Sequence, residues 1–297
     1  MSVDGNISSE TVNSDPPRGG VVIRGGDSLA AVCGVNASKR RRVEHHSFGE
    51  GDCSWRVEAS QGLMTDSKQT DMLVEELGLP QMPEMVFLDN TVSLSFKGEE
   101  RIRFSAKDAL ATVSLIPDPN VKVAATSKWR EARKDSEYID RETLKFDWTF
   151  TPDYSGTFSN IPPHKIRDVE HEWEVINVEK LTRRDPILFF QDLILFEDEL
   201  SDNGCAMLNV KLRAMKTCFL LLLRFYLRVD DVMVRVIDSR FYTEPSWSVI
   251  VWEHTKREAS IPELRAQDIG YSEITRPDEI SPKLTVLSQK TQVIELN

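Results

Sequence analysis

The stretch from Cys218 to Tyr242 constrains the fold of this chain more than any other segment. It begins with an apolar run, residues 219–227, that is about half as long as a membrane-crossing helix and is interrupted by a charge. Asp230 and Asp231 follow as a polar pair typical of a turn, and valines then alternate with other residues over 232–237. The stretch therefore predicts a β-hairpin whose first strand is central and buried on both faces. Its second strand presents Arg235 to solvent or to a partner.

The charge balance narrows the class of partner. Among 297 residues, 48 are acidic and 37 are basic, so the formal net charge is −11. Binding of nucleic acid requires clustered lysine and arginine, so an acidic surface of this kind argues against it. Partners that are basic, that contain metal or that are simply other proteins fit better.

Cysteine usage and the N-terminal sequence indicate where the protein works. The four cysteines are widely spread and none forms a C-x-x-C pair, which is typical of reduced thiols in an intracellular protein. The N-terminal sequence is polar and lacks the apolar core of a signal peptide, so we expect a soluble protein without a membrane partner. We predict a cytoplasmic location. The basic run 39–42 is either a nuclear import signal or a solvated charge cluster.

Composition along the chain predicts three parts. Residues 1–50 are rich in Ser, Asn, Gly, Asp and Pro and are predicted to form a disordered tail. Residues 51–260 are predicted to fold as one α+β domain, built on antiparallel β-sheet with several short helices packed around it. Residues 261–297 contain recurrent prolines and acidic residues and are predicted to be irregular and partly ordered.

Local patterns place the elements of this domain. Besides the hairpin, strands are predicted at 55–59, 92–96, 101–104, 121–124, 207–215 and 249–252. A helix is predicted from Ser67 to Gly78. Further short helices are predicted to begin within 105–108, 127–130 and 177–181. The segment 186–199 is apolar at nearly every helical spacing and begins with Asp-Pro, which favours a helix, although a strand over 193–196 remains open.

The residues that carry catalytic chemistry are few. Five histidines show no metal-ligand spacing, and the sequence lacks nucleophile-elbow, dinucleotide-binding and phosphate-loop motifs, so we expect a binding protein that is not an enzyme and uses no cofactor. The acidic patch Glu197, Asp198, Glu199 and Asp202 leaves a metal-dependent hydrolase as an alternative. A solvated helix end is favoured because the patch lacks the spacing of a calcium loop.

Five ordered motifs add a family resemblance that composition cannot supply. They are LPQMPEMVFLDN (79–90), FSAKDAL (104–110), DWTFTPDYSGT (147–157), LFEDELSDNG (195–204) and LLLRFYLRVDDVMVRVIDSRFY (221–242). Together they closely resemble the TIPRL family of TOR-signalling-pathway regulators, over residues from about 53 to about 279.

The resemblance implies a non-catalytic regulator, monomeric on its own, that binds the catalytic subunits of type 2A-like serine/threonine phosphatases. It also implies that binding restrains the phosphatase or stabilises a latent form, within TOR signalling and the DNA-damage response. A general scaffold or chaperone-like adaptor is the alternative from a different class.

The resemblance further implies four phosphatase-binding residues, Asp108, Ile176, Val236 and Asp238. Asp238 is expected to end the second hairpin strand and to orient the partner, while Ile176 and Val236 supply an apolar anchor. The alternative is that Asp108 caps a helix and that Asp238 pairs with Arg240 or caps a turn. If Asp238 contacts the partner, Asp238→Asn is expected to weaken binding with little change in melting temperature.

Overall fold

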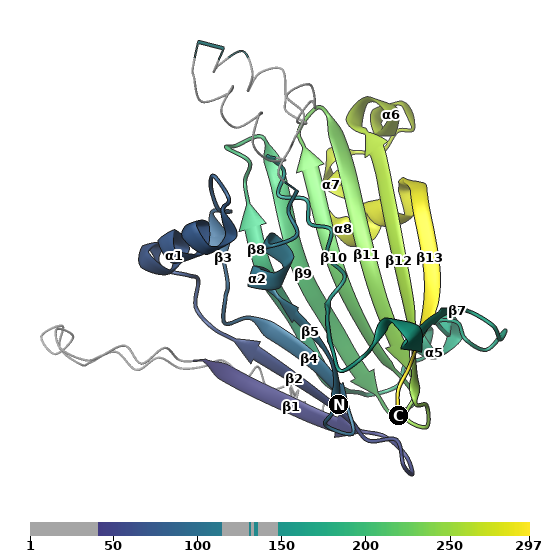
Figure 1. The fold of residues 1–297 in the computed structure, drawn as a ribbon. Coiled ribbons are helices and arrows are strands. Elements are labelled where there is room, and N and C mark those ends of the chain that lie inside the picture. The colour runs from purple at the N-terminus through teal and green to yellow at the C-terminus, as the bar shows by residue number, and fades with distance from the viewer. Residues whose placement is uncertain (1–40, 115–130, 132–133, 136–147) are drawn as a thin grey trace, which may run out of the picture. The chain divides into compact units, whose positions relative to one another are not determined.

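The computed structural model describes residues 41–114, 131, 134–135 and 148–297, and these form two antiparallel β-sheets with short helices around them (Figure 1). This arrangement confirms the predicted α+β class built on antiparallel sheet. The predicted strand 121–124 and helix 127–130 lie outside the described residues.

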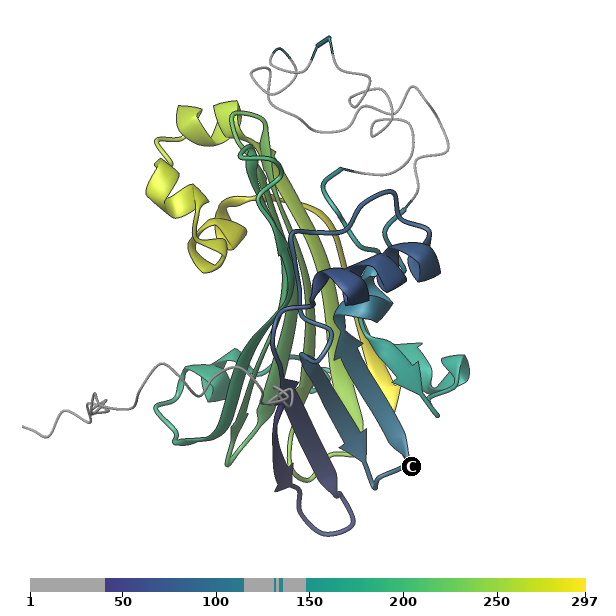
Figure 2. The ribbon, with the colours of Figure 1, turned by 90° about the vertical axis from the view of Figure 1, so that its left-hand side faces the viewer.

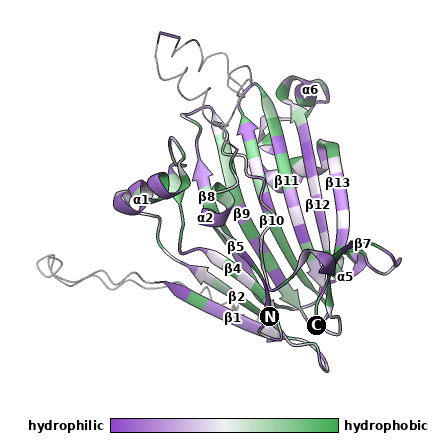
Figure 3. Ribbon diagram, in the orientation of Figure 1, coloured by the Kyte–Doolittle hydropathy of each residue, from purple (hydrophilic) through white to green (hydrophobic). Residues whose placement is uncertain are grey.

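The larger sheet has eight strands in the order β3-β8-β9-β10-β11-β12-β13-β7, and every neighbouring pair is antiparallel. Its strands are β3 (Met85–Val86), β7 (Ile166–Asp168), β8 (Ile187–Asp198), β9 (Gly204–Met215), β10 (Phe219–Val229), β11 (Met233–Thr243), β12 (Val249–Ser260) and β13 (Thr285–Glu295). Figure 3 shows hydrophobic residues gathered on the middle strands and hydrophilic residues along β12.

The hairpin predicted from the sequence is β10 and β11, at the centre of this sheet. Every residue from Leu223 to Leu227 is buried, as expected for a strand covered on both faces. The amide of Val232 donates to the carbonyl of Val229 across the tight turn, and Asp231 adopts a left-handed conformation there, with φ of 61°.

The smaller sheet has the order β1-β2-β4-β5-β6. Its strands are β1 (Arg42–Phe48), β2 (Trp55–Gln61), β4 (Thr91–Phe96), β5 (Glu100–Ser105) and β6 (Thr157–Ser159). The strands predicted at 55–59, 92–96 and 101–104 are confirmed as β2, β4 and β5.

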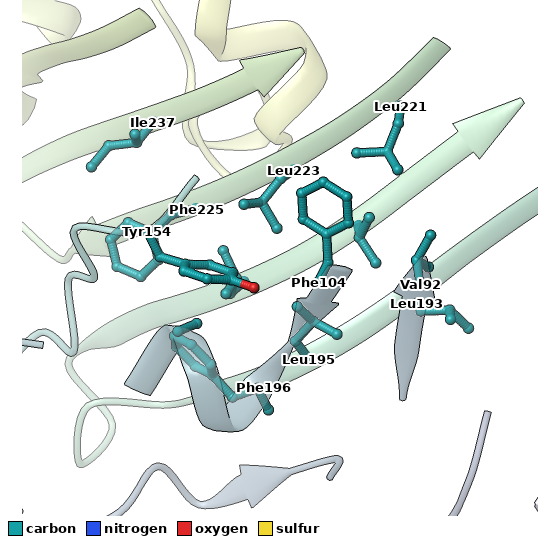
Figure 4. Packing of buried hydrophobic residues seen from close by; sticks show 14 of the residues in the cluster. Val92, Phe104, Tyr154, Leu193, Leu195, Phe196, Leu221, Leu223, Phe225 and Ile237 are labelled. Carbon is teal, nitrogen blue, oxygen red and sulfur yellow. The ribbon is translucent and has the colours of Figure 1, made fainter. Parts of the chain in front are cut away.

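The two sheets pack face to face through a shared hydrophobic core. Phe104 of β5 meets Phe241 of β11 edge to face, with ring centroids 5.3 Å apart. In Figure 4 Phe104 reaches from the smaller sheet towards Leu221 and Leu223 of the larger one. Below, the face of the larger sheet that meets the smaller sheet is called the inner face, and the opposite face is called the outer face.

Short helices close the ends and sides of the sheets. They are α1 (Ser67–Leu77), α2 (Ala106–Leu110), α5 (Val178–Thr182), α6 (Ile261–Ala266), α7 (Tyr271–Ile274) and α8 (Pro277–Ile280). Helix α1 begins with a capping box between Asp66 and Gln69 and ends at Gly78, whose φ is 64°, at the end that the sequence predicts. Figure 2 shows α6–α8 and the smaller sheet on opposite sides of the larger sheet. Within the described residues, no helix is long and apolar enough to span a membrane.

The helix prediction for 186–199 is wrong, because this segment is strand β8. Its register with β9 runs from Ile187 to Asp198, with two local shifts. Apolar residues occupy both faces of β8, and Ile187 and Phe190 are half exposed. A segment with apolar side chains on both faces matches the helical and strand periods equally well, so periodicity could not decide between them.

The two ends of the chain are more regular than the composition predicts. Strand β1, residues 42–48, forms within the predicted tail 1–50. Residues 261–297 are not irregular, because they form α6–α8 and then β13, which pairs with β12 over most of its length. The polar side chains of β13 lie on an exposed strand near the sheet edge, so hydrophobic periodicity does not reveal it.

Candidate binding face of the eight-stranded sheet

Alternation along β11 assigns its side chains to the two faces of the sheet. Val236 packs under α6–α8 and Tyr242 packs beside α5, on the outer face. Ile237 and Phe241 belong to the core between the sheets, on the inner face. Because side chains alternate along a strand, Asp238 lies on the outer face between Val236 and Tyr242.

Asp238 is fully buried in the middle of β11, which corrects the expectation that it ends the strand. It lies opposite Arg224 of β10, whose guanidinium donates two hydrogen bonds to its carboxylate, Nε to Oδ1 at 2.6 Å and Nη2 to Oδ2 at 2.9 Å. Arg240 donates a third hydrogen bond at 3.0 Å, and Arg257 lies within ion-pair distance at 3.5 Å. We call these four residues the Asp238 cluster.

The Asp238 cluster also ties a helix to the sheet. Nη1 of Arg224 donates to Oδ1 of Asp278, the second residue of α8, at 2.5 Å. Burial alone lowers the pKa of Arg224, but its hydrogen bonds to Asp238 and Asp278 raise it, so the guanidinium remains charged. The pairing therefore fixes α8 over Val236, which is itself fully buried.

Arg240 connects this buried cluster to a cleft on the surface. Its side chain is 27% exposed and donates to Glu253 of β12 at 2.6 Å. The cleft has a volume of about 300 Å³ and is lined by Val175, Ile176, Val178, Leu181, Leu220, Arg240, Glu253 and Thr291. We call it the α5 cleft. One side of it is apolar and the other carries a paired positive and negative charge.

The apolar side of the α5 cleft belongs to an exposed ridge. Trp173, Val175 and Val178 are 52%, 49% and 65% exposed, and Ile176 between them packs partly against the sheet. The indole of Trp173 contacts Trp247 edge to face, with centroids 5.1 Å apart. Adjacent exposed apolar side chains of this kind are typical of a surface that binds another protein. We call these four residues, 173, 175, 176 and 178, the α5 ridge.

Glu174, within this segment, holds the ridge in place from below. Its buried carboxylate accepts two hydrogen bonds from Arg167 of β7 and two from the backbone amides of Glu170 and His171. The hydrogen bonds from Arg167 lower the pKa of Glu174 to about 2, and those from the amides add to this effect. Helix α5 then begins at the Asn177 cap, as the sequence predicts.

A second cleft lies on the other side of the Asp238 cluster. It has a volume of about 400 Å³ and is lined by Asp192, Ile194, Met207, Asn209, Lys211, Leu222, Arg224, Pro277 and Asp278. Leu222 in this cleft is the direct cross-strand partner of Arg240 in the α5 cleft. The two clefts therefore adjoin across β10 and β11, with Arg224 and Arg240 held by the same carboxylate.

Three of the four predicted site residues lie on the outer face, and the fourth does not. Ile176 lines the α5 cleft, whereas Val236 and Asp238 are completely buried beneath the surface. Asp108 lies on α2, whose apolar residues pack into the core on the inner face. Its amide donates to Ser105 Oγ at 3.2 Å, as the capping pattern predicts, and its carboxylate accepts from Thr157 at 2.8 Å.

Sequence reasoning missed the exposed part of this face. Val175, Val178 and Glu253 carry no motif that singles them out, because isolated valines and glutamates are common on any surface. Arg240 entered only as a pairing partner for Asp238, and that pairing is present. Arg240 lies two residues after Asp238 on a predicted strand, and this spacing was the one signal that both side chains lie on the same face.

The acidic patch at 197–202 fixes a loop. The carboxylate of Asp198 is buried and accepts hydrogen bonds from the amides of Leu200 at 2.6 Å and Glu84 at 3.1 Å. Burial raises its pKa despite these bonds. Over the described ranges, no three His, Cys, Asp or Glu side chains come together in a way that could hold a metal ion.

The ridge, the two clefts and the rigid sheet beneath them define a class of protein, a β-sheet protein with a face suited to binding another protein. The chain is 37% identical to the TIP41-like protein of Homo sapiens over 244 residues, which cover 82% of this chain and 86% of that protein. It is 37% identical to the TIP41-like protein of Dictyostelium discoideum over 257 residues, 82% of this chain and 91% of that one.

A budding-yeast relative carries a functional name. The type 2A phosphatase activator TIP41 of Saccharomyces cerevisiae is 36% identical over 229 residues, which cover 72% of this chain and 63% of that protein. Residues 85–265 match the model of the TIP41-like family. The chain belongs to the TIP41-like family, which confirms the resemblance drawn from its motifs.

Proposed function

We propose that this protein regulates type 2A-like serine/threonine phosphatases by binding their catalytic subunit with the α5 ridge and the α5 cleft. The observation that carries the proposal is the yeast relative named as a type 2A phosphatase activator, which aligns over 72% of this chain. Support from the geometry comes from Trp173, Val175 and Val178, which leave apolar surface exposed next to Arg240.

The proposed roles of the site residues follow from their exposure. Ile176 contacts the phosphatase directly, together with the exposed valines on either side of it. Asp238 and Val236 have no exposed surface, so they act through their neighbours. Asp238 orients Arg240 towards the partner, and Val236 supports the helices above it. Asp108 forms part of a separate contact on the inner side.

The protein acts as a monomer without cofactor, in the cytoplasm, and connects phosphatase activity to TOR signalling by restraining or stabilising a latent form of the enzyme. The basic run 39–42 is the feature that favours nuclear entry as well. The net charge of −11 argues against nucleic acid as a competing partner.

The experiment uses two valines with the same exposure. Val175 on the α5 ridge and Val286 on β13 are each 49% exposed. Calorimetry with a purified type 2A phosphatase catalytic subunit is expected to show binding that Val175→Ser weakens about tenfold, through lost apolar contact. Val286→Ser is expected to bind normally.

Two outcomes contradict the proposal. If the wild-type chain does not bind an active catalytic subunit, the proposed function is wrong. If both variants lose binding equally, the phosphatase does not bind at the α5 ridge. Phosphatase activity measured with increasing amounts of the chain shows whether the chain activates or inhibits the enzyme. Unchanged activity at saturation contradicts a regulatory role.

A further inference from the structure

A small pocket on the inner face has a lining that the binding face does not use. It has a volume of about 210 Å³ and is lined by Asp153, Tyr154, Ser155, Trp252, His254, Lys256, Lys290 and Gln292. The register places Lys290 directly opposite His254, and Gln292 directly opposite Trp252. The floor of the pocket is therefore the inner face of β12 and β13, and its wall is the loop 153–155 ahead of β6.

The polar groups of the floor are mostly hydrogen-bond donors. Lys256 and Lys290 bring two ammonium groups, whereas the amide of Gln292 already donates to Oδ1 of Asp168 at 3.4 Å. Nε1 of Trp252 is buried and finds no hydrogen-bond acceptor among the described residues. A buried donor without an acceptor is costly, and together with the two ammonium groups it makes the floor complementary to a ligand rich in acceptor oxygens.

The two ammonium groups have one carboxylate beside them in the lining. Asp153, the one acidic residue of the lining, is 84% exposed and forms an ion pair with Lys256 at 3.7 Å, which is longer than a hydrogen bond and exposed to solvent, so it holds Lys256 weakly. Nδ1 of His254 is joined to Ser239 Oγ at 2.7 Å. Burial, and then the charge of Lys256, lower the pKa of His254, so its ring is neutral at neutral pH and the positive charge of the pocket comes from the two lysines.

Two aromatic rings line the pocket, Trp252 in its floor and Tyr154 in its wall. The ring of Trp252 stacks on Phe241 and is fixed in the core, leaving its edge to the pocket. Tyr154 turns its hydroxyl away, donating to the carbonyl of Arg103 at 3.0 Å, so it offers the pocket its ring. Two aromatic rings beside two lysines suit a ligand that joins a flat group to an anion.

We propose that this pocket binds a phosphate monoester carried on an aromatic group, with Lys256 and Lys290 on the phosphate and Trp252 and Tyr154 against the ring. The same chemistry is offered by a phosphorylated tyrosine side chain and by a free aryl phosphate. The pocket opens on the opposite face from the α5 cleft, so its occupation does not depend on the proposed function.

The test is calorimetry on the full chain with four probes: O-phosphotyrosine, phenyl phosphate, O-phosphoserine and inorganic phosphate. Saturable binding of the two aryl phosphates, each at least about tenfold tighter than the other two probes, supports the proposal. If O-phosphotyrosine binds more tightly than phenyl phosphate, a peptide side chain is the source; equal binding points to the free aryl phosphate. If O-phosphoserine binds as tightly as the aryl phosphates, the pocket does not recognise an aromatic group. If no probe binds, the proposal is wrong.

Variants locate the binding to the pocket. Lys256→Gln and Lys290→Gln are each expected to weaken O-phosphotyrosine binding about fivefold to tenfold, because each removes a charge-assisted hydrogen bond. Lys68→Gln on α1 is the matched control, since it removes the same charge from an exposed position away from the pocket. Equal weakening in all three variants means that only net charge attracts the ligand, and it contradicts the assigned site. Unchanged melting temperatures establish that the variants are folded.

Discussion

Arg224 and Asp238 face each other across β10 and β11 and are joined by two parallel hydrogen bonds in a fully buried environment. A bidentate pair of this kind fixes both side chains and, through Asp278 and Arg240, relates a covering helix to an exposed cleft. Asp238 therefore belongs to the framework under the binding face.

This burial changes the expected result of Asp238→Asn. The neutral amide leaves Arg224 and its neighbouring arginines without their shared countercharge, which costs about 3–5 kcal/mol for a buried pair. We expect the melting temperature to fall by about 6 °C or more, together with phosphatase binding, when unfolding is followed by circular dichroism.

Asp278→Asn is the control for that prediction. Asp278 also pairs with Arg224, but its side chain is 72% exposed, so its loss is expected to cost no more than about 1 kcal/mol. Equal destabilisation by the two substitutions contradicts the framework role of Asp238. An unchanged melting temperature in Asp238→Asn has the same meaning.

Glu174 predicts a specific loss of stability in acid. Because the Arg167 pair lowers its folded-state pKa to about 2, below the ordinary value of 4.5, its contribution is complete above the ordinary value. That contribution is lost as the pH falls from about 5 towards 2, because the unfolded chain takes up the proton first. Glu174→Gln is expected to lower the free energy of unfolding at pH 7 and to flatten its dependence on pH in that range.

Urea unfolding at a series of pH values measures this effect. Glu172→Gln, an exposed neighbour, is expected to leave the curve unchanged. Phosphatase binding is expected to weaken in Glu174→Gln, because the α5 ridge follows directly from the loop that this carboxylate holds. A wild-type pH dependence in Glu174→Gln contradicts the assignment.

Gly204 predicts a strong requirement for glycine at the start of β9. Its φ is 154°, and a Cβ atom there would lie 1.9 Å from the carbonyl oxygen of Arg228 on β10. Gly204→Ala is therefore expected to destabilise the fold by about 3 kcal/mol or more, through strain and a backbone clash.

Gly98 provides the comparison, with φ of 79° but no atom within 4 Å of its added Cβ. Gly98→Ala is expected to cost only about 1 kcal/mol, from backbone conformation alone. Denaturant midpoints of the two variants give the difference, and equal values rule out the close approach of β9 to β10.

The sequence predicted those elements in which one strong pattern dominates. The hairpin 218–242 combines a buried run, a turn pair and alternating valines, so its structure follows from the pattern alone. Strand β8 has apolar residues on both faces, and β13 is largely polar, so neither shows a decisive period. Pairing with β9, the next strand in the sequence, determines β8, and pairing with β12 determines β13.

The site was predicted in part for a similar reason. The resemblance pointed to Ile176, Val236 and Asp238, and all three lie on one face of the sheet. Their exposure could not be predicted, because the sequence pattern around an aspartate in a strand is the same whether its carboxylate is solvated or paired with a buried arginine. Only packing reveals that Arg240, two residues further along β11, is the group that reaches the cleft.

The claim that the outer face binds the phosphatase is tested most directly by two arginines of β11. Arg240 on the outer face and Arg235 on the inner face are each 27% exposed, and each pairs with a glutamate of β12. Calorimetry with a type 2A catalytic subunit is expected to show binding about tenfold weaker for Arg240→Gln and unchanged for Arg235→Gln. Unchanged binding in Arg240→Gln, or weaker binding only in Arg235→Gln, contradicts the account.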